Sequence, residues 1–401
     1  MNEIERLISQ LSPNGVPVYA LGAIGTTVSG LRGKSKEDFT DGNAPYVSYV
    51  EIFNNPGIDF VPQKRVKVSQ KESQSAIQLG DVLVTGSSET RNECGMTAVV
   101  TTQPTQPIYL NSFCFIWRPN SGVELDPQFM KHLFRGRGFR DRVIETANGV
   151  TRQNISKQKF LAIEIPVPPI AVQREVASIL NKFTELEAEL EAELEARKSQ
   201  YEFYRKHLLS FRDVEAEDVR WIPMSDIAKN LDSKRRPVTK EHRNNGVYPY
   251  YGASGIVDYV DDFLFDGDFL LVSEDGANLL ARSTPIAFSV SGKNWVNNHA
   301  HVLEFESYEL RRLTEIYLNS IDLAPYVAGG AQPKLSQSNL NKILIPVPPD
   351  QVLAETVAVL DAFEALLEGA LVGLPAEISA RRQQYEYYQS RLLTFKKLEV
   401  A

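Results

Sequence analysis

A five-residue segment occurs twice in this chain of 401 residues. Residues 165–169 read Ile-Pro-Val-Pro-Pro, and residues 345–349 repeat the same five residues 180 positions later. Proline fixes φ and lacks a backbone donor, so each copy interrupts regular structure and favours an extended hinge. Such a repeat constrains the fold strongly, because it predicts two copies of one structural plan within a single chain.

Similar segments flank both copies. Upstream, residues 149–156 (GVTRQNIS) correspond to residues 329–336 (GGAQPKLS) at the same offset. Downstream, residues 197–211 (RKSQYEFYRKHLLSF) correspond to residues 381–395 (RRQQYEYYQSRLLTF) at an offset of 184. We therefore interpret the chain as a tandem duplication. In each copy a region of mixed character precedes a long helix, and the second helix carries four extra residues.

Apolar residues after each proline segment follow the spacing of a coiled coil. They step by four and three residues, with one extra four-residue step in the first copy and two in the second. The first series is Val172, Val176, Ile179, Phe183, Leu186, Leu190 and Leu194, and the second is Val352, Thr356, Val359, Phe363, Leu366, Ala370, Leu374 and Ile378. About 40 helical residues span roughly 60 Å. Because both helices belong to one chain, we expect an antiparallel pair with a pseudo-two-fold axis.

The second helix contains a proline in its second inserted step. Gly373 and Pro375 lie there, so we expect a kink or a short break at this point and a straighter first helix. Taken alone, two long amphipathic helices would also suit a dimerisation coiled coil or an ordinary helical bundle.

The regions before the helices are rich in short β-type runs separated by Gly, Pro, Asn and Asp. We expect strands at 45–50, 82–85, 97–100 and 113–117 in the first half, and at 269–273, 285–290 and 301–305 in the second. Short helices are expected at 127–134 and 308–318. The fold class is therefore α+β, with each half built on a twisted antiparallel sheet.

Charge and composition limit the possible functions. The net charge of −8 argues at first against a DNA-binding protein, but six glutamates crowd residues 185–195 while basic residues cluster elsewhere. Cys94 and Cys114 have no metal-ligand spacing, and we interpret them as buried thiols. With no apolar run of about 20 residues and no export signal at the start of the sequence, the expected location is the cytoplasm.

Sequence motifs of catalysis are absent. A methyltransferase needs a glycine-rich cofactor loop and an Asn/Asp-Pro-Pro-aromatic motif, whereas both Pro-Pro pairs here follow valine. Residues 33–35 (Gly-Lys-Ser) resemble the end of a P-loop, but Val28 stands where its first glycine is required. His299 and His301 lack a third metal ligand in register, so we interpret them as strand residues, one inward and one outward. We expect a chain that is not an enzyme and has no metal site.

The order and duplication of these segments resemble the specificity subunits of type I restriction–modification systems. The resemblance covers essentially the whole chain. It is carried by the proline segments, the helix ends at 200–211 and 384–395, and the segments 80–90 (GDVLVTGSSET), 250–256 (YYGASGI) and 270–278 (LLVSEDGAN). It implies target-recognition domains at 1–169 and 213–349, separated by spacer helices at 170–212 and 350–401. One departure concerns the helix starts, since Gln173 has Leu353 as its counterpart.

The resemblance also implies partners. Each recognition domain would read one half of a bipartite target in double-stranded DNA, and the helices would fix the unread spacing. Two modification subunits would dock on this chain, with restriction subunits added for cleavage. S-adenosylmethionine, ATP and Mg are expected on those partners and no cofactor on this chain. The alternative is a non-catalytic coiled-coil scaffold whose β-rich domains bind protein or carbohydrate.

Candidate DNA contacts fall into two classes, because phosphate contacts position a protein and base contacts specify sequence. The candidates for phosphate contact are Lys34, Lys36, Arg152, Lys234, Arg235, Arg236 and Lys334, each equally compatible with a solvated surface charge. The candidates for base reading are polar residues in two loops: Ser87, Ser88, Glu89, Thr90, Arg91 and Asn92, and Ser273, Glu274, Asp275, Asn278 and Arg282. Tyr46, Tyr49, Tyr250 and Tyr251 are aromatic candidates for the same faces, although a tyrosine in such a strand also suits the core or its rim.

Overall fold

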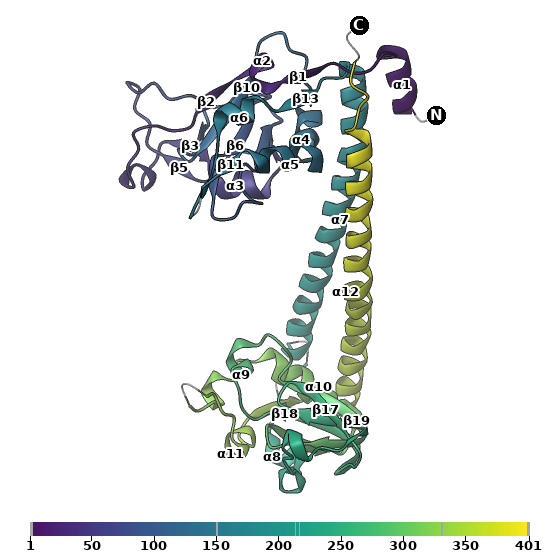
Figure 1. Ribbon diagram of the computed structural model, residues 1–401. Coiled ribbons are helices and arrows are strands. Elements are labelled where there is room, and N and C mark those ends of the chain that lie inside the picture. Colours follow the sequence, from purple (N-terminus) through teal and green to yellow (C-terminus); the bar gives the residue numbers. More distant parts are fainter. Residues whose placement is uncertain (1–2, 150, 213, 216, 330–331, 399–401) are drawn as a thin grey trace. The chain divides into compact units, whose positions relative to one another are not determined.

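A computed structural model describes residues 3–149, 151–212, 214–215, 217–329 and 332–398 of the protein (Figure 1). The chain divides into two compact units. The first unit comprises Met1–Ala192 with Leu374–Ala401, and the second comprises Glu193–Gly373. Each unit therefore joins one α+β domain to the adjoining parts of two long helices.

The long helices are α7, Ile170–Leu209, and α12, Asp350–Leu392. Both begin directly after the proline segments, as the sequence predicts. Part of each proline segment forms a strand: β13 (Glu164–Pro166) pairs with β1 (Val18–Ala20), and β21 (Leu344–Val347) pairs with β14 (Arg220–Pro223).

Helix α12 continues through Pro375, so the expected break is wrong. Proline removes the hydrogen bond to the carbonyl group of Leu371. The side chains of Leu371 and Val372 are exposed at 41% and 75%, which leaves this part of the helix open to water that can hydrate the carbonyl group.

Aromatic pairs show the pseudo-symmetry of the helices inside each unit. In the first unit the rings of Phe183 and Tyr388 stack with centroids 5.4 Å apart. In the second, Phe363 and Tyr204 stack at 4.7 Å. The two phenylalanines are 180 positions apart and the two tyrosines 184, which are the offsets of the sequence repeat. The same contact therefore occurs twice with the helices exchanged, and the predicted antiparallel pairing is confirmed.

The domain of the first unit is built on a sheet in the order β2-β10-β6-β8-β4, in which β4 and β8 are parallel and the other neighbours antiparallel. Smaller sheets have the orders β5-β3-β9 and β11-β12-β7. The bounds are β2 Gly25–Ser29, β3 Ala44–Val47, β4 Gly57–Ile58, β5 Arg65–Val66, β6 Val82–Thr85, β7 Ser87–Ser88, β8 Thr97–Val100, β9 Tyr109–Leu110, β10 Cys114–Pro119, β11 Ala147–Asn148 and β12 Gln153–Ile155.

Helices cover this domain and complete its core. They are α1 Glu3–Leu11, α2 Leu21–Ile24, η1 Glu37–Phe39, α3 Tyr49–Asn54, α4 Pro127–Arg135, α5 Arg137–Glu145 and α6 Lys157–Leu161. Large aromatic side chains fill the core, among them Phe115, Trp117, Phe129 and Phe134. The strands predicted at 82–85 and 97–100 are confirmed. The strand predicted at 45–50 is too long, because a capping box between Ser48 and Glu51 starts α3.

The domain of the second unit has a sheet in the order β15-β20-β18-β19-β16-β17, with β16 and β19 parallel. Both domains therefore contain mixed sheets rather than the purely antiparallel ones that the sequence suggested. The bounds are α8 Met224–Ile227, β15 Ala228–Asn230, η2 Asp232–Lys234, η3 Lys240–His242, β16 Asn245–Gly252, β17 Gly255–Val260, β18 Phe265–Ser273, α9 Asn278–Ala281, β19 Ala287–Val296, β20 Ala300–Phe305, α10 Tyr308–Ser320, η4 Ala324–Tyr326 and α11 Gln337–Leu340.

Candidate DNA-binding surfaces

The predicted base-reading loops lie at equivalent places in the two domains. In the first, the Gly86 amide donates to the Phe113 carbonyl (3.0 Å), and the Ile155 amide donates to the Gly86 carbonyl (2.9 Å). In the second, the Glu274 amide donates to the His299 carbonyl (2.9 Å), and the Leu335 amide donates to the Glu274 carbonyl (2.8 Å). We call residues 86–88, 111–113 and 151–155 the first junction, and residues 274–276, 297–299 and 332–335 the second. The neighbouring Val150, Gly330 and Ala331 lie outside the described residues.

Arg152 is the most prominent predicted residue of the first junction. Its side chain is exposed, its Nε donates to Ser87 Oγ (3.1 Å), and its guanidinium lies 5.7 Å from the ring centre of Phe113. Ser87 and Ser88 are 7% and 6% exposed, so burial leaves them little surface for direct base contact, and their predicted role is corrected to support of the junction.

The turn that follows β7 is exposed but anchored to the domain. Glu89, Thr90, Arg91 and Asn92 all lie on the surface. Thr90 Oγ1 donates to Glu93 (2.8 Å), and the Asn92 carbonyl accepts from the Arg140 guanidinium (2.9 Å). These contacts hold the turn without covering it, so it remains a candidate surface.

At the second junction, Asp275 and Lys334 are the predicted residues that reach the surface. Asp275 contacts His299 Nδ1 at 2.9 Å, and Lys334, 56% exposed at its side chain, pairs with Glu274 at 3.0 Å. His299 lies in the turn before β20, so its predicted strand position is wrong, whereas His301 lies inside that strand and points inward.

Other predicted residues of this loop serve the fold. Ser273 is 1% exposed, and its hydroxyl donates to the Ala253 carbonyl. The side-chain carbonyl of Asn278 accepts from Ser283 Oγ (2.9 Å) and from the Thr284 amide (3.1 Å), which closes the loop. The Arg282 guanidinium donates to two backbone carbonyls, that of residue 318 in the last turn of α10 and that of residue 321 just after this helix, and burial lowers its pKa. The predicted DNA contacts of Ser273, Asn278 and Arg282 are corrected, since their polar side chains already form hydrogen bonds within the domain.

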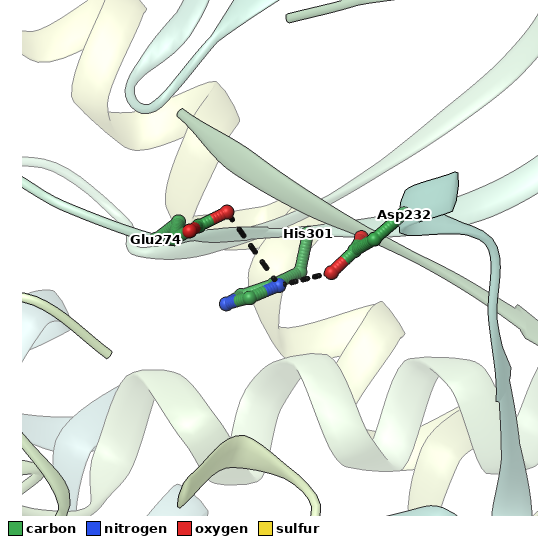
Figure 2. Close-up of side chains that lie close together, drawn as sticks. All are labelled: Asp232, Glu274 and His301. Carbon is green, nitrogen blue, oxygen red and sulfur yellow. Dashed lines mark hydrogen bonds and ion pairs between the residues drawn. The ribbon is translucent and has the colours of Figure 1, made fainter. Parts of the chain in front are cut away.

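Glu274 and Arg235, both predicted to contact DNA, instead belong to a buried ion network with Asp232 and His301. Figure 2 shows three members of this network, Asp232, Glu274 and His301. Arg235 pairs with Glu274 (2.6 Å) and Asp232 (3.2 Å) and donates to the Ala300 carbonyl (2.7 Å). His301 Nδ1 lies 2.6 Å from Asp232, and its Nε2 lies 2.8 Å from the Leu335 carbonyl. Both ring nitrogens of His301 therefore lie next to oxygen atoms of the protein.

This network also has the composition of a metal site, because one oxygen or nitrogen of Asp232, Glu274 and His301 lies within 4.8 Å of each of the others. The ligand atoms are already engaged, however. Arg235 and Lys334 occupy the two carboxylate oxygens of Glu274. Burial alone would raise the carboxyl pKa values of Asp232 and Glu274, but their cationic partners and hydrogen bonds lower both. We therefore interpret the cluster as a structural ion network.

The predicted tyrosines lie mostly inside. Tyr46 is 9% exposed and packs edge to face with Phe39 at 5.1 Å, and burial raises its pKa. Tyr250 is 1% exposed, and its hydroxyl accepts from the Val238 amide at 3.0 Å. The predicted DNA contacts of these two are corrected, because both side chains face the core. Tyr49 and Tyr251 are half-buried, the first stacked on a phenylalanine of α3 and the second packed against one of β19.

Among the predicted phosphate contacts, Lys34 is buried. Its side chain is 4% exposed, pairs with Glu72, and donates to the Lys67 carbonyl at 2.6 Å. The hydrogen bond from Lys34 lowers the pKa of Glu72 to about 2. The predicted phosphate contact of Lys34 is therefore wrong. Lys36, Lys234 and Arg236 are exposed and stay predictions.

Both halves of the chain match one known protein family. A model described as the type I restriction modification DNA specificity domain matches residues 13–196 and again residues 217–379. The match covers most of the chain and occurs once in each half. The chain belongs to this family.

Several specificity subunits are similar in sequence. A type I restriction enzyme specificity subunit of Haemophilus influenzae is 36% identical over 184 residues, which is 45% of this chain and 47% of that relative. A type I specificity subunit of Mycoplasma pneumoniae is 30% identical over 258 residues, 62% of this chain and 92% of that relative. The specificity subunit of an Escherichia coli type I restriction enzyme is 30% identical over 272 residues, 62% of this chain and 67% of the relative.

Solved structures of the family share the fold. The S subunit of a type I restriction–modification system from M. genitalium has a TM-score of 0.55 and 16% identity, with 94% of this chain and 96% of that chain covered. A chain from a study of assembly and conformational transition of the type I system has a TM-score of 0.56 and 15% identity, with 94% and 97% covered. At these identities the likeness concerns the fold alone.

The two helix starts of the chain differ, as the sequence predicts. Gln173 is fully buried, its Nε2 donates to the carbonyls of Pro168 (2.7 Å) and Glu124 (2.9 Å), and its Oε1 accepts from the Asp126 amide (2.8 Å). Leu353 takes the same place in the second copy and packs in an apolar cluster.

Sequence reasoning missed Phe113, which is 65% exposed and belongs to the first junction. A signal was present, because residues 110–114 (LNSFC) correspond to residues 296–300 (VNNHA). That correspondence has an offset of 186 and a single identity, so it becomes visible only through the hydrogen bonds of the two junctions.

Proposed function

We propose that this chain is the DNA-sequence specificity subunit of a type I restriction–modification complex. Each domain reads one half of a bipartite target in double-stranded DNA, and the paired helices fix the distance between the halves. The observation that carries the proposal is the double match to the specificity domain, once in each half of the chain. The equivalent hydrogen bonds of the two junctions support it, because two readers of one kind suit a target in two parts.

The same proposal assigns the chemistry to partner subunits. Two modification subunits dock on this chain and supply methyl transfer from S-adenosylmethionine, and restriction subunits with ATP and Mg join for cleavage. This chain itself performs no catalysis. Within the part of the chain that the structure describes, none of the helices could span a membrane. We expect the complex to act in the cytoplasm, where its DNA is.

The first test is DNA binding by the full chain together with its modification subunits. We expect binding to one bipartite sequence that weakens steeply as salt rises, because phosphate contacts release counterions. A coiled-coil scaffold with protein- or carbohydrate-binding domains would show no sequence-selective binding under the same conditions. That result would overturn the proposal.

The second test concerns the spacing. Residues 187–190 (Glu-Ala-Glu-Leu) recur as residues 191–194 in α7. Duplicating or deleting one unit changes the helix by about 6 Å, so the unread spacer in the methylated target should change by about one or two base pairs. The matched control is Glu189→Gln, which leaves the helix length unchanged. Methylation mapping that returns the original spacing for the length variants contradicts the role of the helices.

A further inference from the structure

The two junctions can be superimposed residue by residue from their hydrogen bonds alone. Strand partners are equivalent, since Trp117 pairs with Val82 and Leu303 with Leu270. In the turns before β10 and β20, the side-chain carbonyl of Asn111 accepts from the amide of residue 113 (2.9 Å), and that of Asn297 accepts from the amide of residue 299 (2.8 Å). The backbone at residue 113 therefore corresponds to that at residue 299.

The third segment of each junction obeys the same equivalence. Gly149 and Gly329 both have positive φ, 132° and 89°. A Cβ atom on Gly149 would lie 2.0 Å from the carbonyl oxygen of residue 152, and one on Gly329 would lie 2.6 Å from that of residue 332. Both turns therefore need glycine at this position, and each brings the residue three places later to a fixed location.

On this common backbone the paired side chains all differ between the two junctions. The equivalent pairs are Phe113 and His299, Ser87 and Asp275, Arg152 and Gln332, and Asn154 and Lys334. Residues 113, 152, 154, 299, 332 and 334 are exposed, whereas the framework residues Ile155 and Leu335 are apolar and buried. A constant backbone that carries variable surface chemistry is what two readers of different sequences require.

We propose that the exposed side chains of these four equivalent pairs determine which bases the two domains recognise, with the buried Ser87 as a support for Arg152. The inference rests on the proposed function and deepens it by naming the reading residues. Phe113 brings an apolar ring to the surface, and Arg152 lies over it with its Nε held by Ser87. A phenylalanine suits the methyl group of thymine, and a guanidinium suits O6 and N7 of guanine.

The second junction presents charged groups instead. His299 is held by Asp275 at 2.9 Å, and Lys334 is held by Glu274 at 3.0 Å. A carboxylate accepts from N4 of cytosine, and an ammonium group donates to O6 and N7 of guanine. The two halves of the target are therefore read by different chemistry on one framework.

The test uses Phe113→Ala and His299→Ala in the full chain with its modification subunits. Methylated sites are mapped by single-molecule sequencing of DNA exposed to each complex. We expect Phe113→Ala to relax discrimination at one or two positions in one half of the target by about tenfold. His299→Ala should relax base discrimination at positions in the other half of the target only. Both side chains are at least half exposed, so neither change removes core packing.

Two further variants complete the design. Tyr19→Ala, which removes a 43% exposed aromatic ring on β1 outside the junction, is the control and should leave the target unchanged. Arg152→Lys keeps the positive charge but loses the planar guanidinium group. It should therefore relax base discrimination in the same half of the target as Phe113→Ala does. A uniform loss of methylation without a change of target, or an unchanged target in both alanine variants, overturns the inference. If the wild-type complex methylates no bipartite target, the proposed function itself fails.

Discussion

The two domains share a backbone plan but differ in the polar groups that they bury. Beneath the first junction lie Gly86 and the apolar Phe115, whereas Glu274 and His301 occupy the equivalent places beneath the second. Asp232 and Arg235 complete the ion network there. One unit thus supports its junction with apolar packing and the other with buried ion pairs.

The contacts between each domain and its helices differ in the same way. In the first unit, His132 of α4 bonds to Asn181 (2.7 Å) and to the Tyr385 hydroxyl (2.9 Å). In the second, Arg312 of α10 pairs with Asp361 (2.7 Å) and Glu364 of α12. Asn181 and Asp361 are 180 positions apart, so a neutral contact and an ionic one occupy the same place. The polar contact therefore lies at the same place in both copies of the repeat, but it is a neutral hydrogen bond in one and an ion pair in the other. The stability of the two units should respond differently to mutation and to pH.

The largest expected effect is in the ion network. Asp232→Ala removes the carboxylate that lies 2.6 Å from His301 Nδ1 and 3.2 Å from the Arg235 guanidinium, which should cost the second unit about 3–5 kcal/mol. Denaturant unfolding gives the size of the loss, and hydrogen exchange should locate it in β18 and β20. Asp266→Ala removes an exposed carboxylate of β18 and is the control. Equal stability of the two variants would show that the network contributes little.

The next effect appears on acidification and concerns the first unit. Burial lowers the pKa of His132 to about 4 from an ordinary 6.5. Above about pH 6.5 the imidazole is neutral in both states. As the pH falls from 6.5 to 4, the unfolded chain takes up the proton and the folded chain does not. The free energy of unfolding should therefore fall by about 1.4 kcal/mol per pH unit, up to about 3 kcal/mol in total.

Comparison with the second unit sharpens this prediction. The lowered carboxyl pKa values of Asp232 and Glu274 stabilise the second unit at neutral pH, and this contribution is lost only below their ordinary values of 3.8 and 4.5. Hydrogen exchange at pH 7 and pH 5 should therefore show opening of the first unit alone. His132→Gln keeps a neutral hydrogen-bonding side chain and should remove the difference. If the first unit still opens at pH 5 in that variant, titratable groups other than His132 cause the opening.

The sequence predicted the architecture well because the architecture rests on periodic features. The proline repeat located both helix starts, and the heptad spacing indicated their pairing. The break at Pro375 was not found, because a helix can lose one hydrogen bond where water reaches the carbonyl group. Local rules also missed α3, although its capping box was present in the sequence.

The candidate site was harder to predict, since burial is a property of the folded chain. Lys34, Arg235 and Tyr250 are polar or charged enough for a DNA surface, yet each is held inside by partners far away in sequence. Phe113 was missed for the opposite reason, because an apolar residue at the start of a predicted strand suggests a core position, whereas Phe113 is 65% exposed. Tertiary contacts decide these cases, and they span 12 to 39 residues of sequence.

The smallest of the three effects concerns the helix starts. Gln173→Leu gives the first helix the residue of the second but leaves the Asp126 amide and the carbonyls of Glu124 and Pro168 without their partner, at a cost of about 2 kcal/mol. The loss should appear as faster hydrogen exchange at the start of α7. Leu353→Met keeps the apolar volume of the second helix start and should cost less than about 1.5 kcal/mol. If Gln173→Leu instead leaves the free energy of unfolding unchanged, the three hydrogen bonds make no net contribution to stability. Glutamine and leucine are then interchangeable at the start of this helix.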